Sequence, residues 1–234
     1  MSMRLQLREM TDILRTDNFE RTIPYLYLDS VGLLTVGVGH NLKVHPVPNV
    51  LSMSFVVKRL ERHATSDGDA GIPITESPAV GRAATPKEIQ NDIDFLKRHP
   101  GLKHYAPQHL AKYTTVELTQ RQINRLFDQD REEAIHACGK EFGVGTFESF
   151  PLPCQAALMD IAFNCGSFWS FRGHFVPAIK GTGQYAGKSW KERWTAAAQY
   201  SRRGAVGAIR NAIVRDWLLE GARLSEKAGA KAIA

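Results

Sequence analysis

Apolar residues near the amino terminus recur at the spacing of a helix. Leu7, Met10 and Leu14 follow one another at intervals of three and four residues, so they would line one face of a helix. The pattern continues to about Glu20, where shorter apolar runs replace it. We therefore predict a first helix that ends near Glu20.

The next segment changes from a helical period to strand-forming residues. Pro24 is incompatible with a helix interior, and residues 25–28 (Tyr-Leu-Tyr-Leu) favour a strand. Residues 29–32 contain Asp, Ser and Gly, which are typical of a turn, and residues 33–38 form a second apolar run. The sequence predicts a β-hairpin over 25–38.

Most of the remaining chain has helical patterns. An apolar stripe predicts a helix over 52–64, and the Gly-, Pro-, Ser- and Asp-rich residues 65–84 predict a loop. Three later segments begin with Ser or Thr followed three residues on by Glu or Gln, which is the signature of a capping box. They are Thr85–Glu88, Thr119–Gln122 and Ser189–Glu192.

Two helices nearer the carboxyl terminus differ in composition. The nearly continuous apolar residues of 153–165 predict a central buried helix, with Gly166 as its C-cap. A last helix is expected over 204–223, followed by an Ala-, Gly- and Lys-rich tail that we expect to fray. Together with the hairpin, these helices predict an α+β fold in which a small hairpin lobe accompanies a mostly helical body.

We expect one domain over residues 1–234, because no linker long enough to separate two independent domains occurs. Its expected parts are the first helix and hairpin (7–43), an extended connection (44–116), a helical body (117–223) and a flexible tail (224–234).

The composition is that of a globular protein with surplus positive charge. Hydrophobic residues make up 43% and charged residues 23% of the chain, which excludes disordered and fibrous proteins. Thirty Lys and Arg residues against 24 Asp and Glu residues give a net charge of +6. This surplus favours a polyanionic partner such as nucleic acid, anionic lipid or bacterial cell wall. Because no basic helix or reader motif occurs, we expect no nucleic-acid partner.

Three expectations rest on what the sequence lacks. No apolar run is long enough to span a membrane. The amino terminus has no apolar signal core, so we expect the protein to be made in the cytoplasm without a signal peptide. Cys138, Cys154 and Cys165 lack the spacing of metal ligands, and we expect three free thiols in the cytoplasm. Pairing of Cys138 with Cys154 in an oxidising compartment is an open alternative.

Several residues around the hairpin have two interpretations each. At the predicted end of a helix, Glu20 would meet the negative end of the helix macrodipole, which favours the protonated form that a general acid needs; the alternative is a solvated Glu. Taken alone, Asp29 would be a turn residue and Thr35 a β-branched strand residue. Gly37 and Gly39 are unusual in a strand, where Gly often marks a close backbone approach to a ligand.

Read together, these residues form one pattern. Glu is followed after eight residues by Asp, then by Gly, by Thr and by the run Gly-Val-Gly-His. The fixed positions are Glu20, Asp29, Gly32, Thr35, Gly37, Gly39 and His40. Their spacing resembles the active-site segment of the phage-type lysozymes, glycoside hydrolase family 24, and meets every fixed position of that pattern without a gap.

Downstream segments extend the resemblance. Residues 118–130, which include Leu-Phe-Asp-Gln-Asp, are similar to the second helix motif of the family, and residues 155–166 are similar to its central helix. The connection 44–116 is much longer than in the phage members. This connection and residues 203–211 resemble the bacterial toxin branch, which comprises the catalytic domain of pesticin and the muramidase effectors of type VI secretion.

The resemblance implies a lysozyme-like fold and a muramidase that hydrolyses the β-1,4 bond between N-acetylmuramic acid and N-acetylglucosamine in peptidoglycan and so lyses bacteria. It implies that Glu20 is the general acid, that Asp29 stabilises the oxocarbenium-like transition state, and that Thr35 helps Asp29 to orient the attacking water. Phage-type members invert the anomeric centre, so we expect the two carboxyl groups roughly 6.5–9.5 Å apart. No metal or organic cofactor is expected.

Other site residues are expected on weaker grounds. Gly39, Asn41 and Asn164 are candidates for sugar contacts, although Asn164 would serve equally well to hold a neighbouring loop. His40 and Arg210 are candidates for supporting the site, Arg210 by pairing with Glu20. The alternatives to Arg210 are Arg203 and Arg215. Four aromatic residues either form core or stack on sugar rings: Phe163, Phe168, Trp169 and Phe171.

Two other activities fit parts of this pattern. A lytic transglycosylase cuts the same bond with a single Glu, and a non-catalytic lysozyme homologue only binds the cell wall; the presence of Asp29 and Thr35 argues against both. The expected partners are peptidoglycan glycan strands and, for a toxin, an immunity or inhibitor protein and a secretion apparatus. We expect a monomer that reaches the cell wall by release or by secretion-system delivery, as a phage endolysin or a bacterial toxin.

Overall fold

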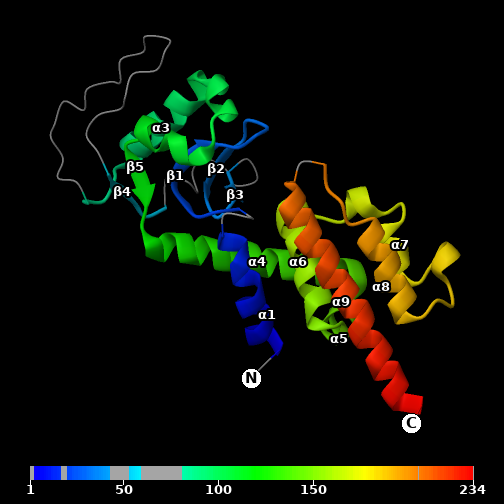
Figure 1. Cartoon of the computed structure of the whole chain (residues 1–234). Helices are drawn as coiled ribbons and strands as arrows, with labels where there is room; N and C mark the ends of the chain where they lie inside the picture. The colour runs from blue at the N-terminus through cyan, green and yellow to red at the C-terminus, as the bar shows by residue number, and fades with distance from the viewer. Residues whose placement is uncertain (1–2, 17–19, 43–52, 59–80, 205, 234) are drawn as a thin grey trace. The chain divides into compact units, whose positions relative to one another are not determined.

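The computed structural model describes residues 3–16, 20–42, 53–58, 81–204 and 206–233 (Figure 1). They fall into two compact units. The hairpin unit is Glu20–Asp128, and the helical unit combines Met1–Phe19 with Gln129–Ala234. The described structure is mostly helical with small antiparallel sheets, so the predicted α+β class is confirmed. That the chain is one domain stays a prediction.

Three antiparallel strands form the main sheet of the hairpin unit. They are β1 (Ile23–Leu28), β2 (Leu34–Gly37) and β3 (His40–Asn41), in the order β1-β2-β3. The predicted hairpin is confirmed, and β3 extends it by one strand. The register places Tyr27 opposite Thr35 and Thr35 opposite Asn41. Because residues directly opposite in antiparallel strands share a face, these three side chains form one row across the sheet.

A second sheet corrects the helix predicted over 52–64. Residues Phe55–Val57 form the strand β4, which pairs with β5 (Val116–Leu118) in antiparallel register. The run Phe-Val-Val strongly favours a strand, and its burial alternates, with Phe55 and Val57 buried. The apolar stripe read as a helical face therefore has a strand period where the structure describes it. Residues 59–64 and the predicted loop residues 65–80 lie outside the described residues.

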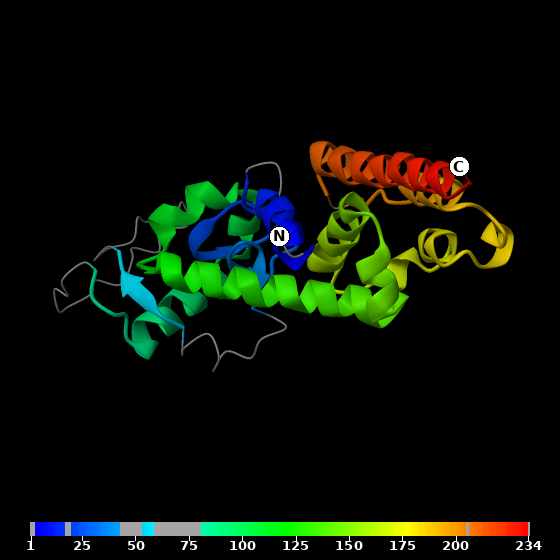
Figure 2. The same cartoon turned by 90° about the horizontal axis from the view of Figure 1, so that it is seen from below.

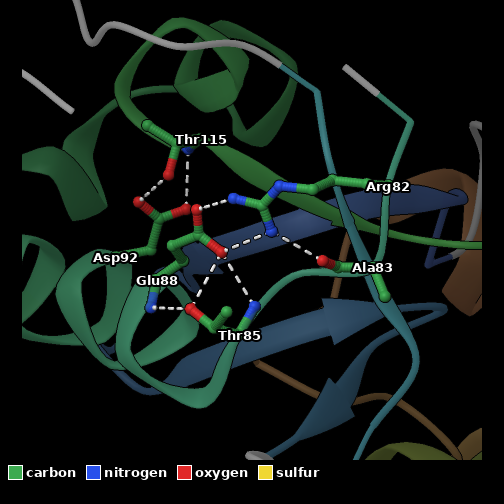
Figure 3. Close-up of polar contacts among 6 residues, drawn as sticks. All are labelled: Arg82, Ala83, Thr85, Glu88, Asp92 and Thr115. Atoms are coloured by element: carbon green, nitrogen blue, oxygen red, sulfur yellow. Dashed lines mark hydrogen bonds and ion pairs between the residues drawn. The ribbon is translucent and has the colours of Figure 1, made fainter. Parts of the chain in front are cut away.

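Helix α3 (Pro86–Arg98) fastens the second sheet to the rest of the hairpin unit. The capping box predicted at its start is confirmed, since the side chains of Thr85 and Glu88 each accept a hydrogen bond from the other's backbone N–H. Figure 3 shows Arg82, in the segment that precedes α3, donating to the Glu88 carboxylate. The same helix presents Asp92 to β5 (Figure 3).

Asp92 is fully buried, and its carboxylate accepts hydrogen bonds from Thr115, which Figure 3 shows, and from Val116. The donors are the backbone N–H of Thr115 at 2.7 Å, the Thr115 hydroxyl at 3.0 Å and the backbone N–H of Val116 at 3.0 Å. A buried carboxylate needs such donors to offset its lost hydration. The described end of the connection 44–116 is thus folded structure, continued by the 3₁₀ helices Pro100–His104 and Pro107–Tyr113.

The first helix is shorter than predicted. Helix α1 covers Met3–Thr11 and is followed by a 3₁₀ helix over Asp12–Arg15. Thr16 then has an extended backbone, and the following Asp17 and Asn18 are poor helix formers. The prediction that this helix reaches Glu20 is wrong, and with it the argument that a helix macrodipole acts on the Glu20 carboxyl group.

The rest of the helical unit is built from a long helix and five further helices. Helix α4 (Gln120–Phe142) begins in the hairpin unit and continues into the helical unit, where α5 (Val144–Ser149), α6 (Leu152–Cys165), α7 (Phe175–Lys180), α8 (Trp190–Gln199) and α9 (Ala208–Ile233) follow. Short 3₁₀ helices cover Trp169–Phe171 and Gly183–Tyr185. Figures 1 and 2 both show α9 running alongside α6 and α8.

Helix α6 is the buried centre of the helical unit, as predicted. Every residue from Cys154 to Ala162 is buried, and the helix ends at Gly166, whose left-handed φ of 69° gives the expected C-cap. Gly221 on α9 faces Cys154 so closely that a Cβ atom would overlap its Sγ. The absence of a side chain at Gly221 therefore allows α9 to pack against α6.

The other predictions for the helical unit have mixed outcomes. The capping box at Ser189 and Glu192 is confirmed. At Thr119 one half is present, since its hydroxyl accepts a hydrogen bond from the Gln122 N–H at 3.2 Å. The last helix begins at Ala208 and extends to Ile233, so the predicted end at 223 is wrong and the segment expected to fray is helical.

The three cysteines are free thiols in this structure. Cys138 and Cys154 are buried, which raises the pKa of each thiol and keeps it in the unreactive protonated form, whereas Cys165 is exposed. Among the described residues, no helix is both long enough and apolar enough to cross a membrane.

Candidate active site

Glu20 lies against the backbone of Gly39. Glu20 lies three residues before the start of β1, and Gly39 lies in the tight turn between β2 and β3 with a φ of 69°. A Cβ atom on residue 39 would lie 2.8 Å from Oε2 and 2.9 Å from Cδ of Glu20, which is too close for a real contact. The unusual glycine in the Gly-Val-Gly-His run thus makes room for the carboxyl group of Glu20. Its predicted contact with a sugar stays a prediction.

The backbone beside Glu20 is strained. Arg21 has a φ of 60° and, among the described residues, is the only non-glycine residue with a positive φ. Its side chain is held by a hydrogen bond from Nη1 to Oε1 of Gln108 at 2.7 Å. A left-handed residue with a side chain costs roughly 1–2 kcal/mol, and such residues concentrate at functional sites. This backbone conformation is part of what sets the position of Glu20.

Asp29 is fixed at the turn between β1 and β2. Its Oδ1 atom accepts hydrogen bonds from the backbone N–H of Val31 at 3.0 Å and of Leu33 at 2.8 Å. Its own N–H donates to the Leu33 carbonyl at 2.9 Å. Both interpretations of Asp29 are therefore compatible, because the contacts that form the turn also hold the carboxylate in one orientation.

Thr35 lies at the centre of the row that crosses the sheet. It is 3% exposed, and its hydroxyl donates to the Leu33 carbonyl at 3.1 Å. Tyr27 and Asn41 lie on its two sides. The Thr35 oxygen keeps its capacity to accept, which is the property that orienting a water molecule requires.

Tyr27 is a site residue that the sequence analysis missed. It is 5% exposed, and the pKa of its phenol is raised first by burial and then by the negative charges of Glu20 and Asp29. The phenol therefore lies within electrostatic reach of both predicted catalytic carboxyl groups and stays neutral. The hairpin register contained the signal, because a turn after Leu28 that pairs Leu28 with Leu34 also pairs Tyr27 with Thr35.

Two further candidate residues, His40 and Asn41, lie on the same sheet. His40 is buried and pairs with Val36 across β2 and β3, and Asn41 is half-buried. The structure thus brings Glu20, Asp29, Thr35, Gly39, His40 and Asn41 together in the hairpin unit.

Arg210 and Asn164 belong to the helical unit. Arg210 is 4% exposed and pairs with Asp160 of α6, its Nη2 lying 2.7 Å from Oδ1. Arg203 also pairs with Asp160, Nη1 to Oδ2 at 2.7 Å, so two buried guanidinium groups share one buried carboxylate. Asn164 is exposed at the end of α6. The pairing of Arg210 with Glu20 and the sugar contact of Asn164 stay predictions.

The exposure of the remaining candidates, Arg215 and the aromatic residues, shows which of them can contact a ligand. Arg215, an alternative to Arg210, is exposed and pairs with the adjacent Asp216 at 3.2 Å. Of the four aromatic residues considered for stacking, Phe168 and Phe171 are buried in the core, whereas Trp169 is 71% exposed.

Two comparisons with known proteins bear on the family of this chain. No protein-family model matches the chain. No curated protein is significantly similar to it. Within the described part of the chain, no three His, Cys, Asp or Glu side chains cluster in a way that would hold a metal ion. The interpretation of the site therefore rests on its own geometry and on the residue pattern of the hairpin.

Proposed function

We propose that the protein is a glycoside hydrolase with a lysozyme-like fold that cleaves the β-1,4 bond between N-acetylmuramic acid and N-acetylglucosamine in peptidoglycan. The observation that carries this proposal is the position of the Glu20 carboxyl group against Gly39, one residue before β3. The same small sheet bears Thr35, and Asp29 follows β1 directly. The spacing of the motif therefore matches the hairpin, since it places Glu20 before β1, Asp29 after β1 and Thr35 on β2.

The chemistry assigned to each residue follows from its surroundings. Glu20 donates a proton to the glycosidic oxygen as the bond to the anomeric carbon breaks. Asp29, oriented by the N–H groups of Val31 and Leu33, stabilises the positive charge that develops on the sugar ring. Thr35 and Asp29 orient the water that attacks from the opposite face, and the Asp29 carboxylate accepts the proton that this water loses, so the product has the inverted configuration.

The charge of the chain supports a cell-wall substrate. Its net charge of +6 attracts an anionic polymer, and peptidoglycan with its attached polymers is anionic. We propose that the protein acts on the wall of bacteria after release or delivery, as an endolysin or as an antibacterial toxin. In a toxin, an inhibitor protein would cover the sheet that bears Thr35.

Digestion of purified peptidoglycan tests the proposal. Wild type, Glu20→Gln and the control Glu133→Gln are compared by mass spectrometry of the products. Glu133 is an exposed carboxylate on α4 that is not part of the motif, so its replacement removes the same charge without changing a motif residue. We expect reducing muropeptides that end in N-acetylmuramic acid from wild type and Glu133→Gln, and none from Glu20→Gln.

Each other result has a definite meaning. Anhydro products from wild type would show that the protein is a lytic transglycosylase and not a hydrolase. Equal amounts of product from Glu20→Gln and wild type would show that Glu20 is not the general acid. No product from wild type would leave a protein that at most binds the wall.

A further inference from the structure

A pocket of about 420 Å³ lies within the helical unit and is lined by residues of the carboxyl end of α4, of the segment after α6 and of α7. Its lining includes Lys140 and Glu141 of α4, Phe168, Trp169 and Arg172 of the segment after α6, and Lys180 of α7. The volume is within the usual range for small-molecule sites, roughly 300–1,000 Å³. The pocket contains none of the motif residues of the hairpin unit, and Phe168 and Trp169 are the candidates for sugar stacking that line it.

An aromatic ring at this pocket is open to solvent. Trp169 is 71% exposed, the largest exposure among the large hydrophobic side chains described. Its neighbour Phe168 is buried, so Phe168 belongs to the core whereas Trp169 lies at the surface. The Arg172 guanidinium lies 4.7 Å from the centre of a Trp169 ring, which restrains the indole. A restrained, exposed indole offers a flat apolar surface at low entropic cost to a ligand.

The charges of the pocket are not balanced. Lys140, Arg172 and Lys180 carry three positive charges, and Glu141 carries the one negative charge among the lining side chains. Glu141 is already engaged, since one carboxylate oxygen lies 2.6 Å from Lys180 Nζ and the other 3.5 Å from Arg172 Nη2. Within the described residues, Lys140 has no ion-pair partner. The lining therefore has an excess of positive charge, which an anionic ligand would balance.

We infer that this pocket binds an anionic saccharide, a pyranose ring that carries a carboxylate. The apolar C–H face of the ring would pack on Trp169, and the carboxylate would accept hydrogen bonds from Lys140 and Arg172. The negative charge of the ligand is argued from the pocket itself, whereas its saccharide nature rests on the proposed function. The pocket would hold a carboxylate-bearing ring of the wall polymer.

A nucleic acid also combines rings and negative charge, but it fits the pocket less well. Single-stranded nucleic acid is bound by successive aromatic residues along a basic groove. Here the lining includes one exposed aromatic residue, Trp169. These observations favour a single ring over a strand.

A titration followed by ligand-observed NMR tests the inference with two soluble sugars. N-acetylmuramic acid carries the carboxylate, and N-acetylglucosamine has the same ring without it. We expect wild type to bind N-acetylmuramic acid about tenfold more tightly, which is the size of a charge-assisted hydrogen bond. Trp169→Ala and Lys140→Gln should each weaken this binding several-fold, by roughly the size of one lost stacking or charged contact.

The control for charge is Lys227→Gln, on an exposed part of α9 outside the pocket, which should leave the binding unchanged. Equal binding of the two sugars, or full binding by Trp169→Ala and Lys140→Gln, would overturn the inference. So would absence of binding to wild type. Displacement of the sugar by single-stranded DNA in a manner that depends on Trp169 would assign the pocket to nucleic acid instead.

The failure of this inference is distinguishable from failure of the proposed function. Glu20→Gln should lose hydrolysis of peptidoglycan and keep full binding of the free sugar. A wild type that hydrolyses peptidoglycan without binding N-acetylmuramic acid through Trp169 refutes the pocket alone. A wild type that binds the sugar through Trp169 and hydrolyses nothing refutes the proposed hydrolase alone.

Discussion

The carboxyl group of Glu20 occupies the space that a side chain on Gly39 would fill. The hypothetical Cβ of residue 39 would lie 2.8 Å from Oε2 of Glu20, and the φ of Gly39 is 69°. Two separate requirements therefore favour glycine at this position: a left-handed backbone and a neighbouring carboxyl group. The tight turn between β2 and β3 and the segment before β1 are thereby joined at the proposed general acid.

We predict that Gly39→Ala reduces activity far more than it reduces stability. A side chain in a left-handed conformation costs roughly 1–2 kcal/mol, and the new methyl group must also displace the Glu20 carboxyl group. A displaced acid costs catalysis about 100-fold. The measurement is peptidoglycan turnover together with the free energy of unfolding by urea denaturation.

Gly81→Ala is the matched control for this prediction. Gly81 also has a positive φ, of 92°, but no described atom lies within 4 Å of its Cβ position. It should lose similar stability and keep its turnover. Equal loss of turnover in the two variants would show that backbone strain, and not the contact with Glu20, explains the effect.

Tyr27→Phe should lower kcat about tenfold while leaving KM and the fold nearly unchanged, because the change removes a polar hydroxyl that lies within electrostatic reach of two carboxyl groups. Burial and the charges of Glu20 and Asp29 raise the pKa of the phenol, so Tyr27 acts as a neutral dipole at every working pH. The expected pH profile of the variant differs from that of wild type, because the surroundings of both carboxyl groups have changed.

Tyr25→Phe supplies the comparison. Its hydroxyl lies within 3.2 Å of the Gln108 carbonyl, and the residue is on the same strand. The loss of this hydrogen bond should cost stability of about 1 kcal/mol and leave kcat unchanged. If both tyrosine variants show the same kcat, Tyr27 has no special place in the site.

Local signals in the sequence predicted much of the fold. The hairpin, the buried helix α6 with its Gly166 cap and the capping boxes at Thr85 and Ser189 all depend on neighbouring residues, and all are present. The segment Phe55–Val57 was misread, because a short apolar run has no reliable period and its partner strand lies near residue 117. Long-range pairing of this kind leaves no local trace.

The local spacing of residues also predicts part of the candidate site, whereas contacts between distant residues do not show in the sequence. The spacing of the motif predicts Glu20, Asp29 and Thr35 as site residues, and these stay predictions, whereas the argument that Glu20 ends a helix is wrong. Its surroundings come from Gly39 and Arg21 instead. Tyr27 was missed because a tyrosine in a strand is ordinary, and only the register pairs it with Thr35.

We predict that Asp92→Ala destabilises the hairpin unit strongly. The change leaves the N–H groups of Thr115 and Val116 without their acceptor in a buried place, at a cost of about 3 kcal/mol or more. The free energy of unfolding measures the effect. Asp94→Ala, an exposed residue two positions further along α3, should change it by no more than about 0.5 kcal/mol. A small effect of Asp92→Ala would mean that β5 is held to α3 mainly by apolar contacts.

The shared carboxylate of Asp160 allows a last prediction, in the helical unit. Asp160→Asn keeps the shape of the side chain but removes the carboxylate that the two buried cations Arg203 and Arg210 share, which should cost about 3–5 kcal/mol of stability. The measurement is chemical denaturation, with Asp216→Asn as the control. Asp216 pairs with Arg215 in solvent, so its replacement should cost less than about 1 kcal/mol. Replacing Arg203 by Met in the Asp160→Asn background should recover part of the lost stability, since it removes one of the two repelling charges. Failure of this second change to recover stability would indicate that lost hydrogen bonds, and not charge repulsion, explain the cost.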